Sequence, residues 1–114
     1  MSPYPLTDRT QLLLEDILYF EGDGNYTFVY YRNRSAVLLS KSIGFLMERL
    51  PEGLFIRISR KYAIHQNAIS SLQFAQGERE VTFFENITLT VSRRRWREFK
   101  QTVGAKPPRL TKLP

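Results

Sequence analysis

Val91-Ser92-Arg93-Arg94-Arg95-Trp96-Arg97 connects a strand-like run to the last helical pattern of the chain. Ser92 is a residue type that caps the start of helices, and Gly104 is a type that ends them. Between them the apolar side chains recur at helical spacing, at Trp96, Phe99 and Val103. The segment therefore predicts a short amphipathic helix whose first turn holds three consecutive arginines.

These arginines occupy the end of the helix that normally attracts acidic residues, because the helix dipole places partial positive charge there. Cations beside unpaired backbone N–H groups are electrostatically favourable mainly when an anion binds, and phosphate is a common ligand at such a position. The pattern indicates a surface for nucleic acid. A solvated basic face without a partner is the alternative.

The basic charge belongs to the second half of the chain. Residues 1–52 hold five Lys/Arg and seven Asp/Glu, a net charge of −2, whereas residues 53–114 hold twelve and four, a net charge of +8. Such asymmetry favours a surface that faces a polyanion.

The composition describes one folded domain. A chain of 114 residues with 42% hydrophobic and 13% aromatic content can bury a core, and its eight Phe and six Tyr favour strands. The lack of cysteine excludes disulfides, thiolate metal sites and cysteine nucleophiles. There is no apolar run of the roughly 20 residues that a membrane helix needs, and no secretory leader. We expect a cytoplasmic protein that has no contact with membranes.

The periodicity predicts more strand than helix. Strand-like runs lie at 12–20, 26–31, 36–39, 54–64, 69–74, 81–84 and 87–91. Turns are predicted at 21–25, 33–34, 76–78 and 85–86. A helix-spaced stripe, which Ser42 precedes and Pro51 ends, is predicted to cover a sheet, through Ile43, Leu46, Met47 and Leu50.

The sequence divides the chain into three stretches. Residues 1–10 are expected to be a lead-in, 11–104 the folded domain and 105–114 a flexible basic tail.

Tyr26, Phe28 and Tyr30 alternate along one strand and are predicted to face the sheet core, with a base-stacking platform as the alternative. A basic interruption at 59–61 divides the strand-like run 54–64.

Three segments, in order, resemble the LytTR family of bacterial DNA-binding domains. The first is Ile17-Leu18-Tyr19-Phe20-Glu21 with its short loop into Asn25-Tyr26, the second is Phe55 to His65, and the third is Val91-Ser92-Arg93-Arg94. The helix end from Leu46 to Pro51 also lies where the family has one. The resemblance covers roughly residues 11–103, and three segments in register are more specific than any one of them.

The resemblance implies a mainly β, elongated fold of small antiparallel sheets, with a short middle helix and a short C-terminal helix. It implies a transcription regulator, of the kind that forms the output domain of response regulators, whose loops enter successive major grooves of double-stranded DNA. It also implies that two copies bind repeated half-sites.

The family's contact segments map by position onto three loops of this chain and the start of the middle helix. The DNA-binding residues that this mapping predicts are Asn25, Tyr26, Thr27, Lys41, Ser42, Ser59, Arg60, Lys61, Ser92, Arg93, Arg94 and Arg95. The chain has Ser59 where the family commonly has His, and His65 where it commonly has Asn. The target sequence of relatives therefore does not transfer to this chain.

Side-chain chemistry divides these residues by role. Arginine can pair bidentately with guanine in the major groove, whereas lysine acts as a point charge toward phosphate. We expect Arg60 and Arg94 to contact bases, and Lys61, Arg93 and Arg95 to contact phosphates.

Other classes of function find less support. A small RNA-binding β domain and a protein-interaction module remain the alternatives. No set of residues indicates an enzyme or a small-molecule substrate, and the lone histidine without cysteine gives no metal site and no cofactor.

Overall fold

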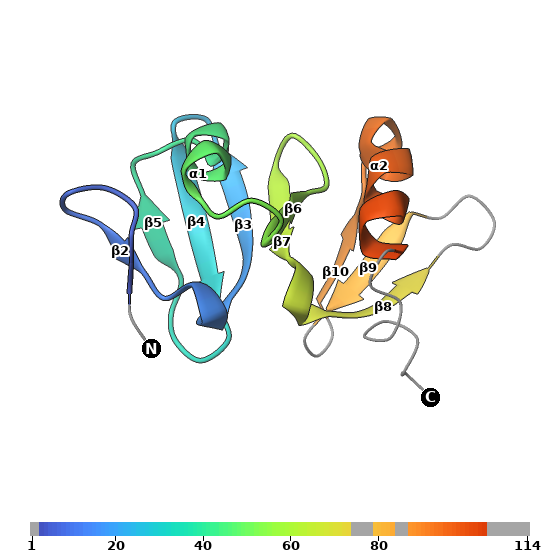
Figure 1. The fold of residues 1–114 in the computed structure, drawn as a ribbon, viewed down its shortest axis with the longest axis horizontal. Coiled ribbons are helices and arrows are strands. Elements are labelled where there is room, and N and C mark those ends of the chain that lie inside the picture. The colour runs from blue at the N-terminus through green and yellow to red at the C-terminus, as the bar shows by residue number, and fades with distance from the viewer. Residues whose placement is uncertain (1–2, 74–78, 84–86, 105–114) are drawn as a thin grey trace.

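The computed structural model describes residues 3–73, 79–83 and 87–104, which form three antiparallel sheets and two helices (Figure 1). The first sheet pairs β1 (Tyr4–Pro5) with β2 (Gln11–Leu12). The central sheet has the order β5-β4-β3-β7-β6, and the third has the order β10-β9-β8. The molecule measures 44 × 29 × 24 Å. The predicted mainly β, elongated fold of small antiparallel sheets is confirmed.

A tight hairpin begins the central sheet. β3 (Ile17–Asp23) and β4 (Tyr26–Tyr31) are joined by a two-residue turn, in which Gly24 has a φ of +62°. The turn is shorter than the predicted loop over 21–25, because Glu21, Gly22 and Asp23 already pair with Phe28, Thr27 and Tyr26. A positive φ of this kind costs glycine little, which suits Gly24 to so short a reversal.

Two of the predicted strands are divided in the structure. The run 12–20 becomes the end of β2, a 3₁₀ turn (Leu14–Asp16) and the start of β3. The run 54–64 becomes β6 (Phe55–Arg57) and β7 (Tyr62–His65), which pair antiparallel. In the second case the basic interruption at 59–61 forms the loop between them.

The remaining strands follow the predicted runs closely. They are β5 (Val37–Leu39), β8 (Ile69–Gln73), β9 (Glu80–Phe83) and β10 (Ile87–Thr90), and a 3₁₀ turn (Gln66–Ala68) precedes β8. The predicted turns at 76–78 and 85–86 and the predicted tail at 105–114 lie outside the described residues.

Helix α1 (Ile43–Arg49) begins after Ser42, whose hydroxyl accepts a hydrogen bond from the Phe45 backbone N–H at 3.1 Å. Helix α2 (Arg93–Gly104) begins after Ser92 and buries Phe99 and Val103. Both helices lie where their apolar spacing predicts them.

The core lies on both faces of the central sheet. One cluster gathers Phe20, Val29 and Ala63 beneath α1, and the Phe20 ring packs at a tilt against Phe55 at 4.7 Å between ring centroids. The other cluster joins the opposite face to α2 and the third sheet, through Leu18, Ile58, Ile64, Val81, Val91 and Phe99. Successive residues of a strand point to opposite faces, so the central sheet connects the two halves of the molecule.

One expectation about burial is wrong. Thr27 and Val29, not the aromatic stripe, face the core under α1, and Tyr26 on the opposite face is 50% exposed. Tyr30 stacks on Tyr19 at 4.4 Å on that opposite face, and we call its β3–β4 part, which the second core cluster leaves partly exposed, the open face. The described part of the predicted lead-in also belongs to the fold, because Leu6 is buried in the core beneath α1.

Candidate nucleic-acid interface

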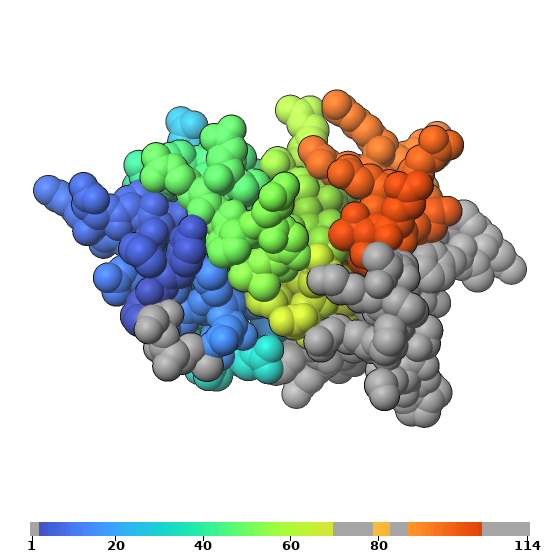
Figure 2. Space-filling view, viewed as in Figure 1, coloured from blue at the N-terminus to red at the C-terminus, as the bar shows by residue number. Residues whose placement is uncertain are grey.

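Four segments that carry predicted contact residues lie along one edge of the molecule. Figure 1 shows the β3–β4 turn, the start of α1, the β6–β7 loop and the start of α2 along the upper edge. In the space-filling view, side chains of the β6–β7 loop and of the start of α2 project from this same edge (Figure 2). The segments are separated by up to about 70 positions in the chain, so the fold is what brings them together.

Three hydrogen bonds join these segments in series. The Thr27 hydroxyl donates to the Lys41 carbonyl at 2.7 Å, which ties the first hairpin to the start of α1. The Gly22 N–H donates to the Lys61 carbonyl, and the Ser92 N–H donates to the Ile58 carbonyl, each at 2.7 Å. These bonds fix the spacing of the segments.

The first hairpin presents exposed Asn25 and half-exposed Tyr26 at its turn. Thr27 is different, because its side chain is fully buried and its hydroxyl is bonded to Lys41. In this structure the Thr27 side chain therefore has no exposed group that could meet DNA as predicted. Thr27 instead holds the hairpin against the start of α1.

At the start of α1, the two predicted residues also differ in availability. Lys41 is exposed, and its ammonium lies 5.0 Å from the centre of the Phe45 ring. Ser42 is half-buried, and its hydroxyl caps α1. Of these two residues, Lys41 is the one whose exposed ammonium can contact an anionic ligand.

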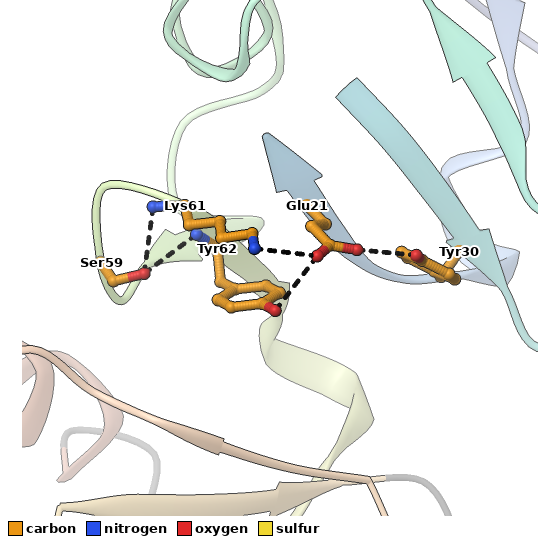
Figure 3. A network of polar contacts seen from close by, with 5 residues as sticks. All are labelled: Glu21, Tyr30, Ser59, Lys61 and Tyr62. Carbon is orange, nitrogen blue, oxygen red and sulfur yellow. Dashed lines mark hydrogen bonds and ion pairs between the residues drawn. The ribbon is translucent and has the colours of Figure 1, made fainter. Parts of the chain in front are cut away.

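The β6–β7 loop is held by Ser59 (Figure 3). Its hydroxyl accepts hydrogen bonds from the backbone N–H groups of Lys61 and Tyr62, at 3.1 and 3.0 Å. Arg60, between Ser59 and Lys61, is exposed. The serine in place of the family's common histidine thus shapes the loop.

A carboxylate lies behind this loop. Glu21 accepts hydrogen bonds from the hydroxyls of Tyr30 and Tyr62, at 2.7 and 3.2 Å, and its carboxylate lies 3.4 Å from the Lys61 ammonium (Figure 3). The hydrogen bond from Tyr30 lowers the pKa of Glu21, and the same bond raises the pKa of Tyr30 to about 12. Glu21 therefore stays charged at neutral pH, and the positive charge of Lys61 is partly balanced.

The start of α2 carries the densest positive charge. Arg93 and Arg94 are exposed, and Ser92 and Arg95 are half-buried. Among the predicted contact residues, all of which are described, only Lys61 forms an ion pair with a described carboxylate. The arginines of this edge are therefore available to an external anion.

The sequence reasoning missed Arg57, which lies one residue before the loop. Its Nε donates to the Ser59 carbonyl and its Nη2 to the Arg60 carbonyl, both at 2.8 Å. Burial, and secondarily the neighbouring Arg95 guanidinium, lower the pKa of Arg57. Arg57 belongs to the second segment of the family resemblance, so the signal was present, but nothing in the sequence showed where the side chain points.

A β scaffold that presents exposed arginines from several loops along one edge has the design of a nucleic-acid-binding domain. The chain belongs to the LytTR family: residues 8–104 match the family described as the LytTr DNA-binding domain. It is therefore a DNA-binding domain of regulatory type, and DNA is its partner.

Solved structures show the same fold. The chain is similar to the LytTr DNA-binding domain of a methyl-accepting/DNA response regulator from Bacillus cereus, with a TM-score of 0.75 and 18% identity over 91% of this chain and 98% of that one. No curated protein matches the chain. No helix within the described residues is long and apolar enough to cross a membrane.

Proposed function

We propose that this protein regulates transcription in the bacterial cytoplasm by inserting the loops of its basic edge into the major groove of a specific DNA sequence. The observation that carries the proposal is the gathering of exposed, unpaired arginines from the β6–β7 loop and the start of α2 on one edge. A projecting loop beside the start of a helix suits a groove better than a flat sheet does.

Base reading is assigned to Arg60 and Arg94, because both are exposed and stand at the projecting loops. Phosphate contacts are assigned to Lys41, Arg93 and Arg95, with a smaller share for Lys61. Phosphate contacts set the register on the duplex, while base contacts carry the sequence preference. Asn25 and Tyr26 would extend the contact from the first hairpin, and two copies would occupy repeated half-sites.

Selection of bound duplexes from a random pool, followed by titration at several salt concentrations, tests this function. With about four phosphate contacts per copy, the logarithm of the association constant of one copy for one half-site is expected to fall with the logarithm of salt with a slope of about −3 to −4. Footprinting of the selected duplex should show two protected half-sites. A flat salt dependence, or a pool that never converges on a sequence, contradicts the proposal.

Lys61 and Arg93 are expected to contribute unequally to the affinity for DNA. Arg93→Ala is expected to weaken binding to the selected duplex and to an unrelated duplex alike, by roughly 3- to 10-fold, and to reduce the salt slope by about 0.9. Lys61→Ala should cost less on both, because Glu21 already balances part of its charge. Titration of both variants on both duplexes measures this, and an equal or larger loss for Lys61→Ala would refute the ranking.

One observation favours a second candidate. The open face of the central sheet exposes half of Tyr26 and part of Phe28 and Tyr30, and aromatic side chains on a sheet can stack single-stranded bases. Competition between the selected duplex and single-stranded RNA of equal length separates the two. Displacement of the duplex by equimolar RNA would favour this RNA-binding reading.

A further inference from the structure

Five successive backbone carbonyls, from Ile58 in the β6–β7 loop to Tyr62 at the start of β7, all accept hydrogen bonds from protein donors. The Ile58 carbonyl accepts from the Ser92 N–H, the Lys61 carbonyl accepts from the Gly22 N–H, and the Tyr62 carbonyl accepts from the N–H groups of Ile58 and Ser59. The remaining two carbonyls, those of Ser59 and Arg60, accept from the single side chain of Arg57.

This arrangement matters for a loop that approaches a polyanion. A carbonyl oxygen carries partial negative charge, so a carbonyl that faces a phosphate repels it. When the carbonyls of a loop are held by donors of the protein, the side chains can point outward and the phosphates meet cations instead. In this loop Arg57 is the donor for the two residues, Ser59 and Arg60, at its tip.

Arg57 occupies a position that would be unfavourable for a cation without the hydrogen bonds that it donates to the loop. It is half-buried, the Arg95 guanidinium is close enough to repel it, and it forms no ion pair with a carboxylate of residues 3–73, 79–83 or 87–104. A partly buried charge without a counter-ion has to be offset by hydrogen bonds. The two loop carbonyls supply them, in the fork geometry that a guanidinium offers.

We propose that Arg57 is a positioning residue for DNA recognition, which turns the carbonyls of Ser59 and Arg60 inward and thereby directs the Arg60 side chain to the bases. The proposal rests on the proposed function, because it assigns Arg57 a role only in a loop that reads DNA. Arg57 itself would make no direct contact with phosphate or base. Its effect should therefore fall on sequence preference and not on general attraction to DNA.

Arg57→Gln and Arg57→Lys test this in the full chain, on the duplex selected from a random pool and on an unrelated duplex of equal length. Both variants are expected to lose about 10-fold in affinity for the selected duplex, the size of one good base contact, and less than about 2-fold for the unrelated one. Lysine keeps the charge but lacks the planar fork that holds two carbonyls at once. The salt slope of both variants should equal that of the wild type.

A direct phosphate contact by Arg57 would give a different result. Arg57→Gln would then weaken both duplexes equally and reduce the salt slope by about 0.9, while Arg57→Lys would restore both. That outcome overturns the proposal. A wild-type protein with no sequence preference would instead refute the proposed function itself, so the two failures are distinguishable.

A double-mutant cycle with Arg60→Ala separates positioning from general destabilisation. If Arg57 acts through Arg60, Arg57→Lys should lower sequence preference in the wild-type background and have almost no further effect on it in the Arg60→Ala background. Independent, additive losses would contradict the inference. Melting temperatures of all variants provide the control, and Arg57→Lys, which keeps the charge, carries the test if Arg57→Gln does not fold.

Discussion

Phe20→Ala is expected to lower the free energy of unfolding by about 3–5 kcal/mol, because it removes a fully buried ring and leaves a cavity. Phe20 lies on β3 beneath α1 and packs on Phe55 at 4.7 Å between ring centroids. Since domains of this size have total stabilities of about 5–15 kcal/mol, the variant should be close to unfolding at ambient temperature. Urea unfolding followed by circular dichroism measures the change.

Phe28→Ala is the matched control for Phe20→Ala. Phe28 lies on the neighbouring strand β4, on the open face of the same sheet, and is only partly buried. Its replacement should cost roughly 1 kcal/mol, since less apolar surface returns to water. A larger loss of stability for Phe28→Ala than for Phe20→Ala would show that the faces of the central sheet are assigned the wrong way round.

Those faces mark the limit of what the sequence could predict. The alternation of Tyr26, Phe28 and Tyr30 predicted a strand correctly, because period-2 patterning depends on local geometry alone. It gave the wrong buried face, since burial depends on where α1 packs, and α1 covers Thr27 and Val29. Both helices were predictable because caps and apolar spacing are local signals too.

The candidate site, too, has features that the sequence could predict and features that it could not. The arginines at the start of α2 and in the β6–β7 loop could be named from charge, spacing and resemblance. The pairing of Lys61 with Glu21, and the two bonds from Arg57 to loop carbonyls, depend on side-chain directions that no periodicity carries. The burial of Thr27 could not be predicted for the same reason, because a position within a matched segment does not show whether a side chain points to solvent or to core.

Arg94→Ala is expected to lower the preference for the selected duplex over an unrelated one by about 1–3 kcal/mol, or roughly 5- to 150-fold. Arg94 is exposed in the first turn of α2, two residues after Ser92, whose N–H donates to the Ile58 carbonyl. That bond holds the start of α2 beside the β6–β7 loop, so the guanidinium of Arg94 has a fixed base from which to reach a groove. The exposure of Arg94 means that stability should change by less than about 0.5 kcal/mol.

The matched control is Arg93→Ala, which removes the same charge from the adjacent exposed position. If Arg94 reads a base and Arg93 contacts phosphate, Arg94→Ala should change the ratio of the two affinities, whereas Arg93→Ala should lower both affinities and leave their ratio unchanged. Arg94→Lys should behave like Arg94→Ala in sequence preference, because an ammonium lacks the bidentate fork, yet it should retain the affinity for unrelated DNA. Titrations of all three variants at one salt concentration decide between these roles. Equal losses of affinity on both duplexes for Arg94→Ala would show that Arg94 contacts phosphate and that other residues read the sequence.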